Sequence, residues 1–203
     1  MSRRTLDEEE VSIRFANTVA WRLRDPNEER LGSPDALLEW LGQNGAARPS
    51  EIKAVRQTWS AIPGAATEAY ETAIRLREAV YRLFIACIAQ QEPPPSDAAF
   101  FSQFLWQQPT TLQLQWDGAR LSWHSDATSM DALDLLRPIA LSAAGLMTGS
   151  RARKIRQCQD DRGCGWLFVD ESRLQNRRWC TMGDCGNLAK ARRHRERVRA
   201  ERH

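Results

Sequence analysis

The sequence predicts a mainly α-helical protein with one small β-hairpin. A helical N-terminal domain over residues 1–149 is followed by a small C-terminal four-cysteine module over residues 150–203 that ends in a basic helix. Three observations predict this. Apolar residues recur every three or four positions through most of the first part, as helices with one buried face require. Four of the five cysteines lie in the last 46 residues. The charge also changes sign, from 14 basic against 19 acidic residues before residue 150 to 15 against 7 from there on, which favours a polyanionic partner for the second part.

Start and stop signals define the predicted helices. Acidic residues open a helix over residues 7–23. Ser33 followed by Pro34 pairs a capping side chain with a proline at the first helical position. Proline or glycine ends most of the others. The remaining helices are predicted from Ser33 to Gly42, from Ser50 to Pro63, from Thr67 to Gln91, from Ser96 to Leu105, and from Met130 to Met147 with Pro138 inside it.

One β-hairpin interrupts this helical pattern. Leucine and tryptophan alternate with polar residues over residues 112–116 and again over residues 121–123. Asp117-Gly118 between these segments is a favoured hairpin turn. Because two strands alone are only marginally stable, we expect the hairpin to lie on helices.

Several classes of protein are excluded by the same sequence. No apolar run approaches the roughly 20 residues that a membrane-spanning helix needs. The N-terminus has no apolar region after its basic residues, so we expect no secretory signal and a cytoplasmic location. The sequence has no glycine-rich phosphate loop, no His-Glu-x-x-His and no nucleophile elbow, so it does not predict an enzyme.

The four clustered cysteines form two pairs, Cys158-x5-Cys164 and Cys180-x4-Cys185. Four thiolates around one tetrahedral Zn²⁺ make a closed structural site with no open position for catalysis. Most zinc modules have gaps of two to four residues, and the gaps here are five and four, so spacing alone leaves reduced thiols or a redox-active disulfide as alternatives. Cys87, in an apolar helical stretch, is interpreted as a core residue.

The residues around these pairs are more specific than their spacing. The run from Trp179 to Asn187, and the basic residues after it, resemble the CGNR zinc-finger family. The family pattern is matched at Cys158, Cys164, Trp166, Leu167, Phe168, Arg177, Arg178, Trp179, Cys180, Met182, Cys185, Gly186 and Asn187. The resemblance implies that Cys158, Cys164, Cys180 and Cys185 bind one structural zinc ion. Leu188 departs from the pattern, since the family has arginine there, and the phosphate or base contact of that arginine is absent.

Two further segments are similar to the ABATE domain that precedes this finger in family members. They are Phe15-Ala16-Asn17-Thr18 and Pro138-Ile139-Ala140-Leu141-Ser142-Ala143-Ala144. The combined resemblance implies a bacterial stress-induced transcriptional regulator with a zinc-dependent nucleic-acid-binding tail.

The basic tail carries the predicted contacts to nucleic acid, with DNA favoured over RNA. We expect a helix from Leu188 to Arg199 with Asn187 as its N-cap. A thin apolar seam of Leu188, Ala191 and Val198 would dock this helix on the zinc core. Phosphate contacts are predicted for Arg173, Arg177, Arg178, Lys190, Arg192, Arg193, Arg195 and Arg197.

Other roles fit the same residues. The N-terminal domain is a candidate for sensing a small-molecule effector or for forming a homodimer. A protein-interaction adaptor would use the basic finger to bind an acidic partner. A redox sensor would release zinc when its thiols are oxidised.

Overall fold

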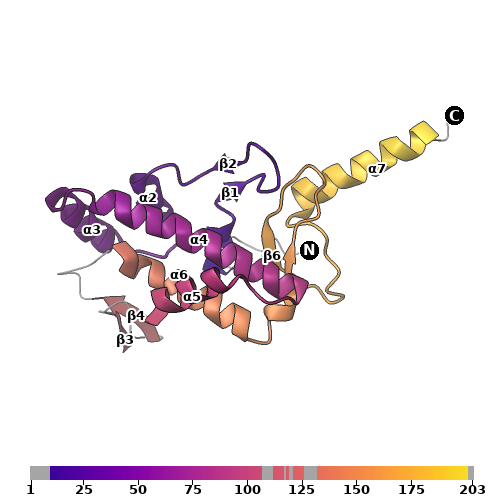
Figure 1. Ribbon diagram of the computed structural model, residues 1–203. Helices are drawn as coiled ribbons and strands as arrows, with labels where there is room; N and C mark the ends of the chain where they lie inside the picture. Colours follow the sequence, from indigo (N-terminus) through magenta and orange to yellow (C-terminus); the bar gives the residue numbers. More distant parts are fainter. Residues whose placement is uncertain (1–9, 107–111, 117, 119–120, 126–131, 201–203) are drawn as a thin grey trace.

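The computed structural model describes residues 10–106, 112–116, 118, 121–125 and 132–200 of the 203-residue chain. Helix α4 runs through the length of the body, with α5 and α6 beside it (Figure 1). Helices α2 and α3 lie at one end of α4, and β6 lies at the other, where α7 projects away from the body. The described residues form the helices Val11–Ala16 (α1), Pro34–Gln43 (α2), Pro49–Ala61 (α3), Ala65–Ala89 (α4), Pro95–Trp106 (α5), Ala132–Thr148 (α6) and Asn187–Ala200 (α7).

The described strands form three antiparallel pairs, so the predicted mainly α fold is confirmed with two more short pairs than the sequence indicated. The predicted hairpin is β3 with β4, and Leu114 lies opposite Trp123. Its Asp117 lies outside the described residues. The strands are Val19–Ala20 (β1), Glu28–Glu29 (β2), Leu112–Trp116 (β3), Leu121–Ser125 (β4), Ile155–Gln157 (β5) and Leu167–Val169 (β6).

Six predicted helices, α2 to α7, lie within a few residues of their observed bounds, and local signals mark several of their ends. The Ser33 hydroxyl accepts a hydrogen bond from the backbone N–H of Ala36 at 3.1 Å, and Pro34 is the first residue of α2. Helix α4 ends at Gln90, which has a left-handed backbone with φ of 53°. Pro138 lies inside α6, as predicted.

The first predicted helix, over residues 7–23, is wrong beyond Ala16. Helix α1 ends there, and the chain then forms β1, which pairs with β2 in the register Val19 to Glu29. Residues 7–9 lie outside the described part of the chain. Val19 is the last residue of the apolar spacing that suggested a longer helix. It is buried, but it belongs to strand β1.

The hydrophobic core is continuous from the helices into the cysteine module. Phe15 of α1, Phe84 of α4 and Ile139 of α6 are fully buried at its centre. Ile155 of β5 and Leu167 of β6 are buried in the same cluster. The domain boundary between residues 149 and 150 stays a prediction. The buried core extends across this position. No helix among the described residues is long and apolar enough to cross a membrane.

Candidate metal centre and basic helix

The four predicted ligands meet at one point. The sulfurs of Cys158, Cys164, Cys180 and Cys185 all lie within 4.8 Å of one another. The sulfur of Cys180 is 3.8 Å from that of Cys164 and 3.8 Å from that of Cys185. A tetrahedron with Zn–S bonds of about 2.3 Å has sulfurs about 3.8 Å apart, whereas a disulfide has them about 2.05 Å apart. The arrangement therefore fits one zinc ion held by four thiolates.

Neighbouring thiols and backbone N–H groups favour negative charge on the sulfur of Cys158. Strands β5 and β6 lead into this turn, where the N–H of Cys158 donates to the carbonyl of Trp166 at 2.7 Å. Gly163 and Gly165 have φ of 90° and 66°, values that side-chain-bearing residues rarely adopt. Hydrogen bonds from the Cys164 and Cys180 thiols lower the pKa of Cys158 to about 2, and backbone N–H groups support this.

The remaining thiols need a cation before they lose their protons. Hydrogen bonding to Cys158 and Cys164 raises the pKa of Cys180 well above its usual range, and burial and repulsion add to this. Burial raises the pKa of Cys185, with the neighbouring Asp160 adding to the effect. A thiolate in the cluster thus opposes the ionisation of the neighbouring thiols. A divalent metal supplies the positive charge that lets all four ionise, which makes zinc binding dependent on pH.

The second pair is held by a short turn that leads into α7. Residues Met182–Gly186 form one π-helical turn (η3) directly before α7. The Thr181 hydroxyl accepts from the N–H of Asp184 at 3.3 Å and so caps this turn. The prediction that Asn187 is the N-cap is therefore wrong, because the helical winding begins before it. Cys185 lies inside the turn, so the metal centre and the start of α7 share a residue.

Buried Asp160 and half-buried Arg162 form a charge pair beside the sulfurs. The Asp160 carboxylate, whose side chain is 1% exposed, accepts from Arg162 Nη2 at 2.5 Å and from its Nε at 3.0 Å. These hydrogen bonds hold the pKa of Asp160 well below its usual range. Arg162 Nη2 also lies 4.0 Å from the sulfur of Cys185. Positive charge at this position offsets part of the negative charge of four thiolates.

The N-terminal domain completes the first turn of the metal centre. The backbone N–H groups of Arg22 and Leu23 each donate at 3.0 Å, to the carbonyls of Cys164 and Gly163 respectively. Trp166 Nε1 donates to the carbonyl of Val19 at 2.8 Å. The segment after α1 is thus hydrogen bonded directly to the predicted metal ligand Cys164 and to Gly163 and Trp166 on either side of it.

Asn17 acts as an additional partner for β6. Its Nδ2 donates to the carbonyl of Leu167 at 2.9 Å, and its Oδ1 accepts from the N–H of Leu167 at 2.8 Å. A side-chain amide thereby takes the place of a neighbouring strand. Thr18, the next residue, accepts a hydrogen bond from Arg77 of α4 at 3.1 Å.

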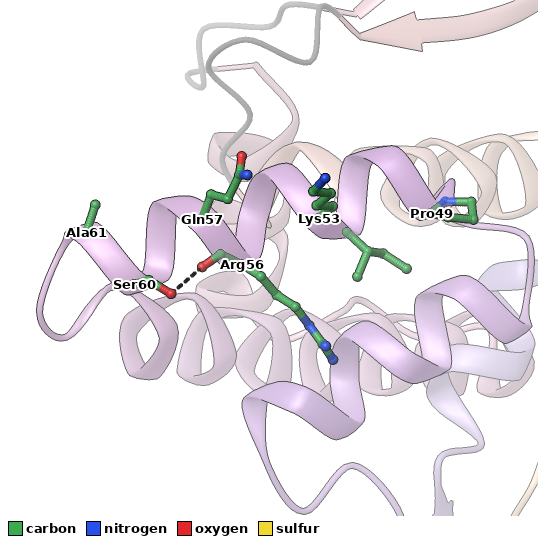
Figure 2. Close-up of a pocket in the computed structure, with 7 residues that line it drawn as sticks. Pro49, Lys53, Arg56, Gln57, Ser60 and Ala61 are labelled. Atoms are coloured by element: carbon green, nitrogen blue, oxygen red, sulfur yellow. Dashed lines mark hydrogen bonds between the residues drawn. The ribbon is translucent and has the colours of Figure 1, made fainter.

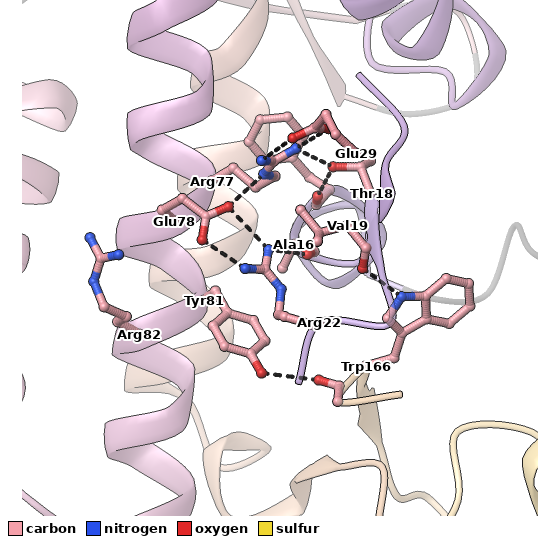
Figure 3. A network of polar contacts seen from close by, with 12 residues as sticks. Ala16, Thr18, Val19, Arg22, Glu29, Arg77, Glu78, Tyr81, Arg82 and Trp166 are labelled. Carbon is pink, nitrogen blue, oxygen red and sulfur yellow. Dashed lines mark hydrogen bonds and ion pairs between the residues drawn. The ribbon is translucent and has the colours of Figure 1, made fainter. Parts of the chain in front are cut away.

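A buried ionic network fastens this segment to α4 (Figure 3). Arg77, whose side chain is 3% exposed, pairs with Glu29 at 2.6 Å and with Glu78 at 2.9 Å. Arg22 pairs with Glu78 at 2.7 Å and lies over the ring of Tyr81, 3.9 Å from its centroid. Burial opposes ionisation of Glu78, yet the hydrogen bond and charge of Arg22 outweigh it and lower the pKa of this carboxyl.

Tyr81 carries the connection from α4 to the metal centre. Its hydroxyl donates to the carbonyl of Gly165 at 3.1 Å and accepts from Gln157 Nε2 at 2.7 Å. Burial raises the pKa of Tyr81, so the hydroxyl keeps its proton for this bond. Tyr81 and Asp160 have no distinctive signal in the sequence, because an apolar stripe and an acidic pair are common features.

The predicted nucleic-acid contacts fall into two groups. Four are engaged within the protein: Arg177 donates to the carbonyl of Cys180, Arg178 to Gln159, Arg192 pairs with Asp161, and Arg193 lies over the ring of Trp179. The other four, Arg173, Lys190, Arg195 and Arg197, are exposed and have no ion pair or hydrogen bond to a described residue.

Helix α7 leaves the body of the protein (Figure 1). Leu188 is 40% exposed and Ala191 is exposed as well. The prediction that these residues dock on the zinc core is therefore wrong. The helix is held at its base by η3 and by the pair between Arg192 and Asp161.

A hollow on the surface of α3 lies far from the cysteines. It has a volume of about 610 Å³ and runs along α3 (Figure 2). Lys53 and Arg56 are its charged residues, and Arg56 pairs with Asp35 at 3.1 Å. All of its lining residues come from α3. A single helix supplies one wall and no converging polar groups, so this hollow does not define an effector site.

Comparison with known families agrees with the fold and the metal centre. Residues 9–150 match the ABATE family, described as "Putative stress-induced transcription regulator". Residues 154–198 match the CGNR zinc finger. Among curated proteins, none matches the sequence well enough to count as a relative. With about two thirds of its length matched by one model and its four cysteines placed to hold one zinc ion within the other, the chain belongs to the ABATE family and carries a C-terminal CGNR zinc finger.

Proposed function

We propose that this protein is a transcription regulator that binds DNA through α7, with the zinc centre fixing the base of that helix. The observation that carries the proposal is the position of α7, which projects from the body and is basic along its length. Between Asn187 and Ala200 the sequence has six lysines and arginines against one glutamate. Such a charge density attracts phosphates and releases their counterions.

The division of the basic residues supports a specific role for each group. The engaged arginines Arg177, Arg178 and Arg192 hold the two cysteine turns and the helix base together. Exposed Lys190, Arg195 and Arg197 lie along the projecting part and are proposed to contact phosphates. The arginines that hold the finger together thus differ from the basic residues that are proposed to bind DNA phosphates.

DNA is the favoured nucleic acid. The major groove of B-form DNA admits an α-helix, whereas the major groove of double-stranded RNA is too deep and narrow for one. Helix α7 projects from the body, which leaves it open to such a groove (Figure 1). The proposal places the protein in the cytoplasm with the DNA and assigns it no catalytic step.

The N-terminal domain is proposed to regulate the finger, by binding an effector or by forming a homodimer. Its direct hydrogen bonds to the first cysteine turn support this role, since a change in the position of Arg22 or Leu23 would be felt next to Cys164. An adaptor that binds an acidic protein is the alternative supported by the same exposed charge.

DNA binding is tested by fluorescence anisotropy with the zinc-loaded chain and a labelled duplex. The expected result is binding at low salt that weakens steeply between about 50 and 200 mM salt. An acidic peptide of equal charge serves as the competitor. Binding to the peptide but not to the duplex would favour the adaptor, and no binding of the duplex at low salt would contradict the proposed function. Selection of bound sequences from a random DNA pool then measures specificity.

A further inference from the structure

A small half-open cavity lies where the N-terminal domain meets both cysteine turns. Its volume is about 80 Å³. Ala20 and Trp21 form its wall on the N-terminal side, and Trp166 and Thr181 form part of the other. Cys164, Cys180 and Cys185 line it, whereas Cys158 does not. Three of the four sulfur-bearing residues are therefore reached through one opening.

The size of the cavity selects what can enter. One water molecule needs about 10–15 Å³ of such a cavity, so several water-sized molecules fit. Hydrogen peroxide is of this size, and a tripeptide thiol or a protein oxidant is not. Trp21, which lines the cavity, has a left-handed backbone, φ 52°, and its ring centroid is 5.4 Å from the guanidinium carbon of Arg24 and 5.1 Å from that of Arg162. A bulky residue held in this conformation is uncommon and is a feature of functional sites.

Cys180 is the sulfur best placed to react. It is half-buried, while the other three ligands are buried. Its sulfur has two neighbours at 3.8 Å, so a second thiol is at hand for a disulfide. Cys164 is restrained by the backbone bonds of its turn to Arg22 and Leu23. Cys185 lies in the short η3 turn, in which Met182, Gly183 and Asp184 are exposed and Cys185 and Gly186 are buried, and no backbone bond to the N-terminal domain is described for it.

We propose that this cavity is an oxidation site at which hydrogen peroxide joins Cys180 to Cys185 and releases the metal. The Cys180 thiolate attacks one peroxide oxygen, the O–O bond breaks, and a sulfenic acid and hydroxide form. The Cys185 thiolate then attacks that sulfur and expels a second hydroxide. Two thiolates, one peroxide and two protons thus give one disulfide and two waters. The sulfurs lose two electrons, and peroxide gains them.

The consequence reaches α7. The disulfide removes two of the four ligands, so the affinity of the site for zinc collapses. The new bond also closes the η3 turn on itself, and Cys185 lies just ahead of Asn187, where α7 begins. Oxidation would therefore remove the metal from the base of α7 and leave the Arg192–Asp161 pair as a remaining contact of that base with the body. The oxidation itself does not depend on what α7 binds.

The test uses the zinc-loaded full chain, hydrogen peroxide and a dye that absorbs when it binds zinc. The expected result is release of one zinc per chain, reversed by a dithiol reductant, with a peptide disulfide between Cys180 and Cys185 in the mass spectrum. Cys87→Ser should leave both results unchanged, because Cys87 lies on α4 outside the cluster. Retention of zinc at high peroxide, or oxidation confined to Cys87, would overturn the proposal.

A second pair of variants tests the route. Trp21→Ala removes the bulky side chain from the N-terminal wall of the cavity and should make peroxide-driven zinc release several-fold faster. Trp106→Ala removes a tryptophan that is 80% exposed at the end of α5 and should leave the rate unchanged. Zinc loss without peroxide is followed in parallel, so that simple loosening of the site by Trp21→Ala is measured and subtracted. Equal peroxide-driven rates in both variants would exclude this cavity as the route.

Discussion

The side chain of Asn17 connects the part of the chain that matches the ABATE family to the part that matches the CGNR zinc finger. The residue ends α1, and both polar atoms of its amide bond the backbone of Leu167 in β6. No aliphatic residue of similar size offers a donor and an acceptor together. The amide therefore satisfies two backbone groups at a buried strand edge, which links the N-terminal domain to the strand that follows the first cysteine pair.

Replacement of this amide should destabilise the protein. Asn17→Ala leaves the N–H and carbonyl of Leu167 without these partners, and we expect a loss of about 1–3 kcal/mol in the free energy of unfolding. Urea unfolding measures it. Asn176→Ala is the matched control, because Asn176 is exposed and has no hydrogen bond to a described residue. Equal stability of the two variants would show that the Asn17 bonds contribute nothing.

Cys180 carries the prediction about metal content. Cys180→Ser removes one of four thiolates and leaves a weak hydroxyl ligand, so we expect about one zinc in the purified parent chain and little or none in the variant. Metal analysis by mass spectrometry measures this. Cys87→Ser should keep its zinc. A full complement of zinc in the Cys180 variant would exclude this residue as a ligand.

At the scale of elements, local signals predicted most helices and none of the pairing between distant segments. Ser33 and Pro34 mark the start of α2, and the apolar stripe of α4 marks its length. The turn of residues 117–118 marked the β3–β4 hairpin. Pairing of β1 with β2 could not be predicted, because Glu28 and Glu29 have low strand propensity and the ion pair that holds β2 on α4 joins Glu29 to the distant Arg77.

The ionic network between α4 and β2 predicts a dependence of stability on pH. The pKa of Glu78 is lowered in the folded state, since Arg22 and Arg77 outweigh the effect of burial. A lowered pKa gives a contribution that is complete above the unfolded value of about 4.3 and is lost as pH falls through the folded value. Glu78→Gln should therefore destabilise the protein by about 1–3 kcal/mol near neutral pH.

The same variant should approach the parent at acidic pH. Urea unfolding of both proteins at neutral pH and below pH of about 4 measures the difference. Glu92→Gln is a control, because Glu92 is exposed after α4 and forms no ion pair with a described residue. A difference between parent and Glu78→Gln that stays constant with pH would contradict an ionised network.

Helix α7 carries the prediction about charge. The double variant Arg195→Ala and Arg197→Ala should lower the slope of log affinity against log salt by about 2, close to 0.9 for each phosphate that is no longer neutralised. Lys53→Ala with Arg56→Ala removes equal charge from α3, at the other end of the body (Figure 1). Anisotropy titrations at several salt concentrations compare them. Equal slopes for the two double variants would show that Arg195 and Arg197 of α7 do not contact DNA phosphates.

At the scale of the whole molecule, the metal centre and the N-terminal domain form one structural unit. Ile155 and Leu167 are buried in the same core as Phe15 and Phe84. Backbone bonds from Arg22 and Leu23 complete the first cysteine turn. Zinc binding to four thiolates should therefore stabilise the helices of the N-terminal domain as well as the finger.

The sequence could identify the ligands but not this junction. The cysteines stand in a recognisable pattern, and their sulfurs meet as that pattern requires. Arg22 and Leu23, the backbone partners of the first turn, lie about 140 residues away from it. A buried tyrosine, or an asparagine after a short helix, has no distinctive spacing. The same limit explains why Asn187 was expected to cap α7, since Thr181 precedes it by a full π-helical turn.

Thermal unfolding before and after removal of zinc tests this unit most directly. Far-ultraviolet circular dichroism reports mainly on α1 to α6, which hold most of the helical residues. If the zinc centre is built into the N-terminal domain, chelation should lower the midpoint of this helical transition by about 5–15 °C while it stays a single transition. A helical transition at the same temperature with and without zinc would show that the finger is a separate appendage and would contradict a single structural unit.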